Sequence, residues 1–156
     1  MKITLLVVGK TTNNALETLI ADYQKRLTHY APFELRVLPE LKNAKSLSFE
    51  QQKQSEGEMI LKSVTASSWV VLLDEHGKEY RSVEFAEWLQ KSMSAGRDIV
   101  FVVGGPYGFS PDVYARANAQ IALSKMTFSH QMVRLVFVEQ IYRAMTILKG
   151  EPYHHE

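Results

Sequence analysis

The stretch "DIVFVVGGPYGFSPDVYARA", residues 98–117, places a strand, a turn and a helix start in immediate succession. The apolar residues 99–103 predict a buried strand, and three glycines follow within residues 104–108. Ser110 is a suitable N-cap for a helix with Pro111 at its first position. This order is typical of the ligand-binding turns found at the carboxyl ends of strands in α/β sheets.

The turn does not match the familiar phosphate-binding patterns. Its spacing is neither G-x-G-x-x-G nor the Walker pattern, and Pro106 lacks the N–H that a phosphate would need. No lysine or arginine lies in the turn. The turn alone leaves two alternatives open, a plain tight turn or a binding turn. In the second case, an adenosine without a phosphate fits better than a triphosphate.

Strand and helix patterns alternate along the rest of the chain. Apolar runs predict strands at residues 3–8, 33–38, 69–74, 99–103 and 121–124, with a turn at Gly77 after the third strand. Helical patterns cover residues 16–27, 49–63, 83–93, 111–120 and 132–149, the second with a capping box of Ser48 and Gln51 and the third capped by Ser82. We therefore expect one α/β domain over residues 1–156, with a mostly parallel five-stranded sheet flanked by helices.

Composition limits the functions that the chain can have. No apolar run approaches the roughly 20 residues of a membrane span, and "MKITLLVVGK" fits a buried first strand better than a signal sequence. The absence of cysteine excludes disulfides, thiol nucleophiles and cysteine-based metal sites, and it suits the cytoplasm. A net charge of +1 does not by itself indicate nucleic-acid binding, which would need a local patch, oligomerisation or a preformed RNA surface.

The last helical segment, residues 132–149, is apolar around most of its circumference. A terminal helix packed on one layer of sheet has a single face to bury, so the remaining apolar surface predicts a subunit interface. We therefore expect a homodimer, the commonest symmetric oligomer.

Polar candidates cluster in the last third of the chain. The loop "LSKMTFSHQMVR" carries His130 and Arg134 just after a strand, and Glu139 and Arg143 have the i, i+4 spacing of a helical ion pair. His130 is equally compatible with a structural role, and the ion pair with a surface position. The tail histidines have no spaced partners for a metal, so we expect no metal site.

Several of these segments together resemble one family. "MKITLLVVGK", "GGPYG", "LSKMTF-H", "R-----EQIYRA" and "LKGEPYHHE" are similar to the ribosomal RNA large-subunit methyltransferase H family of small SPOUT enzymes, over essentially the whole chain. The resemblance implies a C-terminal trefoil knot that holds S-adenosyl-L-methionine in a bent pose. It also implies methylation of N3 of a pseudouridine in 23S rRNA, with the assembled ribosome as the preferred substrate.

The resemblance also implies where each functional residue lies. Cofactor contacts would come from Leu73, Gly104, Leu123, Ser124, Lys125, Met126, Thr127 and Phe128. Base, orientation and RNA contacts would come from His130, Arg134, Glu139, Arg143, Tyr153 and His154, with His154 the first candidate for the base and Glu139 the second. The tail of one chain would then serve the cofactor site of the other.

Two positions depart from the family pattern. Ser129 stands where proline is common, and His155 replaces the usual arginine or lysine. Two other readings stay open: a flavodoxin-like nucleotide-binding protein, and a non-catalytic dimeric factor that binds ribosomes.

Overall fold

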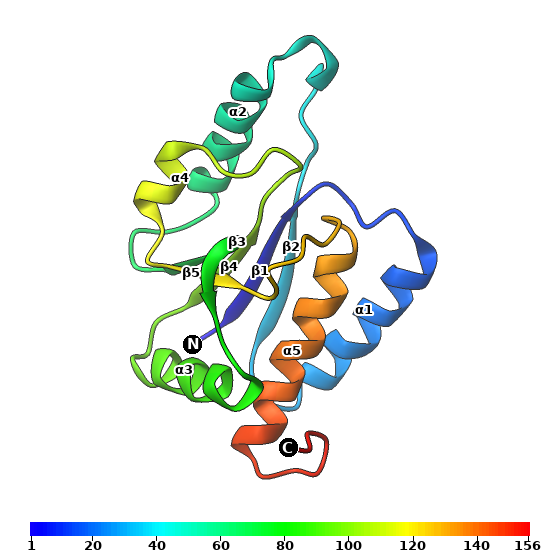
Figure 1. The fold of residues 1–156 in the computed structure, drawn as a ribbon, viewed down its shortest axis with the longest axis vertical. Coiled ribbons are helices and arrows are strands. Elements are labelled where there is room, and N and C mark those ends of the chain that lie inside the picture. The colour runs from blue at the N-terminus through cyan, green and yellow to red at the C-terminus, as the bar shows by residue number, and fades with distance from the viewer.

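The computed structural model describes residues 1–156 as a parallel sheet of five strands with the order β2-β1-β4-β3-β5 (Figure 1). The strands are β1 (Ile3–Val8), β2 (Phe33–Leu38), β3 (Trp69–Glu79), β4 (Ile99–Val103) and β5 (Ala119–Ala122). The helices are α1 (Asn14–Leu27), α2 (Phe49–Lys62), α3 (Ser82–Ser94), α4 (Pro111–Arg116) and α5 (Met132–Leu148), with a short 3₁₀ turn at Ala44–Ser46. The predicted α/β class is confirmed.

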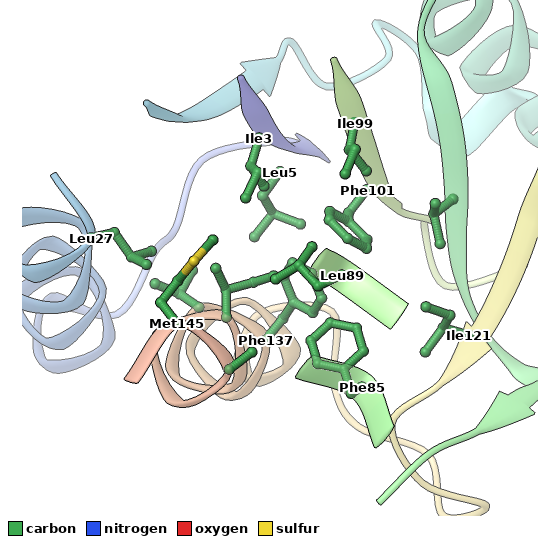
Figure 2. Close-up of a cluster of buried hydrophobic side chains, with 14 of the residues drawn as sticks. Ile3, Leu5, Leu27, Phe85, Leu89, Ile99, Phe101, Ile121, Phe137 and Met145 are labelled. Carbon is green, nitrogen blue, oxygen red and sulfur yellow. The ribbon is translucent and has the colours of Figure 1, made fainter. Parts of the chain in front are cut away.

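Helices cover both faces of the sheet. The larger core packs α1, α3 and α5 against one face, where Leu5, Phe101 and Phe137 lie together (Figure 2). The smaller core packs α2 and α4 against the other face, around Leu72 and Val102. Strand side chains alternate between the two cores, as the period of two residues in a strand requires. No helix is both long and apolar enough to cross a membrane.

Several local predictions are confirmed by the caps. Ser48 with Gln51 forms the expected capping box of α2. Ser110 caps α4. The prediction for α3 is wrong by one residue, because Arg81 is the N-cap and its N–H donates to the side chain of Glu84.

The end of β3 differs most from expectation. Instead of turning at Gly77, β3 continues to Glu79, and both Leu73 and Lys78 pair with Ile121 of β5. Residues 74–77 therefore leave the ladder and rejoin it. A Cβ on Gly77 would lie 2.6 Å from backbone atoms of Gln120 and Ile121, so this close approach requires glycine.

The neighbouring boundaries shift in the same region. β5 begins at Ala119 rather than at residue 121, and α4 ends at Arg116 rather than near residue 120. The side chain of Asn118 accepts the N–H of Val70, so the chain enters the edge of the sheet directly after α4.

Helix α5 lies between α1 and α3 (Figure 1). Its inward face is buried and includes Arg134, Phe137 and Ile141. The rest of its surface is not buried by this chain, and a stripe at spacings of three or four residues runs along it: Met132, Val136, Glu139, Arg143 and Ile147. The single chain therefore buries one face of α5, although α5 is apolar on more than one face.

Candidate functional site

A cavity of about 640 Å³ opens at the carboxyl edge of the sheet. Three segments form most of its wall: residues 73–76 at the end of β3, residues 103–109 after β4, and residues 123–130 after β5. Seven of the eight expected cofactor residues line it, namely Leu73, Gly104, Leu123, Ser124, Met126, Thr127 and Phe128. Its size lies within the range of small-molecule sites.

The glycine turn is shaped by close contacts as well as by the cavity. A Cβ on Gly105 would lie 2.4 Å from a carboxylate oxygen of Glu56 on α2, and Gly108 has a φ of 85°. The N–H of Gly108 donates to the carbonyl of Gly105. The positive φ of Gly108 favours glycine, whereas a side chain at position 105 would have to displace the flexible carboxylate of Glu56, so the plain-turn alternative explains part of the motif. The same turn also lines the cavity.

An acidic group at the end of β3 forms one wall. Asp74 accepts hydrogen bonds from the N–H of His76 at 2.8 Å and from the hydroxyl of Tyr114, which reaches across from α4. Burial by itself would raise the pKa of Asp74, but these bonds together with the imidazole of His76 hold it below the usual value. Burial and the bond to Asp74 raise the pKa of Tyr114 to about 12.

Sequence reasoning missed this group. Asp74 was visible only as the last residue of a predicted strand. Tyr114 lies 40 positions away on a short helix, and its pairing with Asp74 depends on α4 crossing the end of β3.

The loop after β5 is fastened to the end of β3. Thr127 donates from its hydroxyl to Glu75 at 2.8 Å, and the N–H of Met126 donates to the hydroxyl of Ser124 at 2.9 Å. Lys125 does not line the cavity, and its ammonium lies 3.9 Å from a carboxylate oxygen of Glu79. The two segments therefore form one wall with a defined shape.

Arg134 holds the start of α5 against the end of β1. Its side chain is buried, with 1% of the residue exposed, and every guanidinium nitrogen donates a hydrogen bond. The acceptors are the carbonyls of His130, Gly9 and Val8 at 2.9–3.0 Å and the hydroxyl of Thr11. Burial lowers the pKa of Arg134, partly offset by the nearby Glu40. Four of its five N–H donors are therefore used inside the protein, and the side chain is too buried to face a ligand.

The remaining candidates gather at the other end of α5. Arg143 donates to Glu139 at 2.7 Å, lies 3.0 Å from Nδ1 of His154, and stacks on the ring of Tyr153. The hydroxyl of Tyr153 donates to Glu139 and lies 3.3 Å from the hydroxyl of Tyr23. Burial first, and the bond with Tyr23 second, raise the pKa of Tyr153. Glu139, Arg143, Tyr153 and His154 are called the tail cluster below.

The contact with Arg143 determines the tautomer of His154. A guanidinium has only donors, so Nδ1 of His154 accepts, and the neutral ring carries its proton on Nε2. Nε2 is buried without a hydrogen-bond partner, although a carboxylate oxygen of Glu156 lies 3.5 Å away. A buried N–H without a partner is a donor ready for a ligand.

The cavity and the tail cluster are far apart in one chain. Val133 lines the cavity, and Arg143 follows ten residues later, about 15 Å along the helix axis. The structure thus divides the expected residues into two groups at opposite ends of α5 (Figure 1). No group of three or more histidine or acidic side chains is placed to hold a metal ion.

Comparison with known proteins gives one consistent result. A family model described as "Predicted SPOUT methyltransferase" matches residues 1–154. Proteins named "Ribosomal RNA large subunit methyltransferase H" from Phocaeicola vulgatus and Bacteroides fragilis are each 59% identical to the chain over the full length of both sequences. The protein of the same name from Flavobacterium johnsoniae is 55% identical, again over the full length of both.

Proposed function

The chain belongs to the SPOUT methyltransferase family, and from that premise we propose that it transfers a methyl group from S-adenosyl-L-methionine to N3 of a pseudouridine in the 23S rRNA of the assembled ribosome. The names of its full-length relatives support an action on large-subunit ribosomal RNA. The family also agrees with the C-terminal trefoil knot expected from the sequence. A cytoplasmic location follows from this substrate.

The chemistry of the cavity supports this methyl donor. S-Adenosyl-L-methionine carries a sulfonium cation and no phosphate, and it supplies the methyl group as a strong electrophile. The wall contains the carboxylates of Asp74 and Glu75, whereas Lys53 is its only lysine or arginine. Carboxylates favour a cation and repel a pyrophosphate. The single observation that carries the proposal is this cavity, whose carboxylates disfavour a phosphate. The family resemblance assigns its three wall segments to the donor.

The separation of the two residue groups supports a composite site in a homodimer. A methyl acceptor must lie within about 3.5 Å of the donor, yet Arg143 of the same chain lies about 15 Å along the helix from Val133 in the cavity wall. The stripe on α5 runs from Met132 beside the cavity to Ile147 beside the tail. If two copies pair these stripes antiparallel, each tail cluster lies beside the other copy's cavity, as a two-fold axis requires.

The tail cluster then orients the acceptor. In the free chain Arg143 covers Nδ1 of His154, so His154 can donate from Nε2 but cannot accept a proton. For His154 to act as the base that removes the N3 proton, Arg143 must leave Nδ1. We propose that an RNA phosphate attracts the guanidinium away. Glu139 remains the second candidate, and it is also engaged by Arg143 and Tyr153.

Arg134 has a positioning role in this scheme. Its bonds to Val8, Gly9 and His130 fix the loop after β5 relative to the end of β1. His130 itself lines the cavity, and its backbone is held by this arginine. We propose that Arg134 acts on the donor site through this loop and contacts neither RNA nor donor.

Two measurements test the activity. Calorimetry should show binding of S-adenosyl-L-methionine and none of flavin mononucleotide. Ribosomes from a strain without the modification should accept a tritiated methyl group, and digestion of their RNA should place it on N3 of a pseudouridine. Flavin binding without donor binding would favour the nucleotide-binding alternative. Ribosome binding without methyl transfer would favour a non-catalytic factor.

Single-turnover rates of His154→Ala and Glu139→Gln separate the two base candidates. Loss of the true base should slow transfer about a hundredfold or more. Unchanged rates in both variants would exclude both assignments.

Mixed dimers test the composite site. Gly104→Val should block the cavity, where Gly104 lines the wall, and Arg143→Gln should disable the tail cluster. When the two inactive variants are denatured and refolded together, about half of the dimers are mixed, and each mixed dimer has one intact site, which gives about a quarter of wild-type activity. Activity near zero in the mixture would show that each site uses residues of one chain only.

A further inference from the structure

Exposed apolar side chains gather around the mouth of the cavity. Nine large hydrophobic residues are exposed on the whole chain, and four of them line the cavity: Tyr107, Tyr114, Met126 and Phe128. A fifth, Phe49, stacks on Tyr107. Since single exposed hydrophobic residues are normal but a concentration of them is not, this rim is a candidate interaction surface.

Phe49 and Tyr107 form a stacked pair on this rim. Their ring centroids are 4.0 Å apart and their planes differ by 21°. Phe49 is 61% exposed and Tyr107 is 42% exposed, so most of the surface of Phe49 faces water. Phe49 is the first residue of α2 and Tyr107 belongs to the glycine turn, so the pair bridges two segments that are far apart in sequence.

Two exposed lysines precede the aromatic pair in the chain, seven and four residues before Phe49. The connection before α2 carries Lys42 and Lys45, both exposed and neither in an ion pair with a carboxylate. The amide of Gln52 donates to the carbonyls of Ala44 and Leu47, which holds this connection against α2. Aromatic rings flanked by unpaired lysines are the combination with which proteins bind single-stranded nucleic acid.

We propose that Phe49 and Tyr107 are a stacking platform for an unpaired base of the RNA substrate, next to the nucleotide that enters the cavity, while Lys42 and Lys45 contact phosphates. The proposal rests on the proposed function and names the RNA contact of that same site. A second copy of the chain is the less suitable occupant. The platform begins on α2, which covers the opposite face of the sheet from α5 and its stripe.

Matched substitutions distinguish stacking from apolar contact. Phe49→Leu and Tyr107→Leu keep apolar bulk but remove the aromatic face, whereas Phe49→Tyr and Tyr107→Phe keep it. With ribosomes as substrate, each leucine variant should raise KM about tenfold at little change in kcat, because a base loses its stacking partner. The aromatic variants should keep the wild-type KM. All four should melt like the wild type, because both rings are exposed.

Two further readouts complete the test. Calorimetry with S-adenosyl-L-methionine should give wild-type affinity in the Phe49 variants, because Phe49 does not line the cavity. Weaker donor binding in Phe49→Leu together with the raised KM would overturn the platform. Unchanged KM in the leucine variants would overturn the platform and favour an apolar protein contact.

Co-sedimentation with ribosomes needs no methyl transfer. If the wild type transfers no methyl group, weaker sedimentation of the leucine variants would still support the platform, whereas equal sedimentation would overturn it.

Discussion

Two arginines of α5 lie nine residues apart on the same helix and have opposite surroundings. Arg134 is 1% exposed and bonds to three backbone carbonyls and one hydroxyl. The side chain of Arg143 is 27% exposed and contacts only side chains, those of Glu139, Tyr153 and His154. Carbonyls of a folded backbone cannot move away, whereas side chains can exchange one partner for another.

This contrast separates a positioning role from a substrate-facing role. A buried cation without a carboxylate partner is costly, and it persists at Arg134 because each guanidinium nitrogen donates at least one hydrogen bond. The ion pair of Arg143 with Glu139 is only 27% and 19% exposed, but it consists of side chains that can change partners, so the arrangement around Arg143 suits a role beyond stability. RNA binding would explain the side-chain partners of Arg143. Holding the start of α5 against the end of β1 explains the backbone partners of Arg134.

Arg143→Gln tests the substrate-facing side of the contrast. We expect the single-turnover rate on ribosomes to fall about a hundredfold or more, because a positioned cation is lost from the site. The melting temperature should drop by about 5 °C, since the hydrogen bond of this partly buried pair is worth about 1.5 kcal/mol. Melting as low as that of an Arg134 variant would remove the distinction.

Arg134→Met tests the structural side. Buried carbonyls of Val8 and Gly9 would lose their donor, which should destabilise the fold by about 3 kcal/mol. Thermal melting should fall by about 9 °C, with weaker donor binding by calorimetry.

Arg134→Lys serves as the control, because one ammonium cannot reach all three carbonyls, and it should recover only part of the stability. Wild-type melting of Arg134→Met together with lost activity would instead place Arg134 in contact with substrate.

Tyr153→Phe separates the hydroxyl of the tail cluster from its ring. Losing the bonds to Glu139 and Tyr23 should reduce stability by about 1 kcal/mol. Because the folded pKa of Tyr153 is raised, its hydroxyl contributes fully below the unfolded value of about 10 and is lost as pH rises through the folded value. The difference in melting between variant and wild type should therefore be constant near neutral pH and shrink in strong alkali. A constant difference throughout would contradict the cause given for the pKa.

Tyr114→Phe has the smallest expected effect, at the cavity end. Without the tyrosine hydroxyl, the pKa of Asp74 should rise toward its ordinary value of about 3.9, while the bonds from His76 remain. A carboxyl group with a lowered pKa contributes stability above its unfolded value, and that contribution is lost as pH falls through the folded value. The variant should therefore lose less stability on acidification, and the loss should be complete at a higher pH than in the wild type. Carbon-13 titration of the Asp74 carboxyl measures the shift directly.

Sequence patterns were sufficient for much of the fold. Apolar runs located every strand, and short-range capping patterns such as Ser48 with Gln51 predicted helix starts, because both depend on neighbouring residues. The bulge after Leu73 was missed, since it arises from the register between β3 and β5. A turn signal at Gly77 was in fact a close approach of two strands.

The site shows the same limit. The family resemblance named eight of the 21 residues of the cavity wall and all of the tail cluster, but it could not separate Arg134 from Arg143. The two arginines differ in their burial and in the type of their hydrogen-bond partners. Both properties depend on tertiary structure. The pairings of Tyr114 with Asp74 and of Phe49 with Tyr107 likewise join residues more than 35 positions apart.

The central place of α5 has a consequence for how the chain folds. Phe137, Val138 and Ile141 complete a core whose first members, Ile3 and Leu5, are synthesised more than 130 residues earlier. The part of the sheet face that α5 covers stays exposed to water until this last helix docks. Closing so long a loop is entropically unfavourable and slows folding, so refolding from denaturant should be slow and prone to aggregation before α5 is in place.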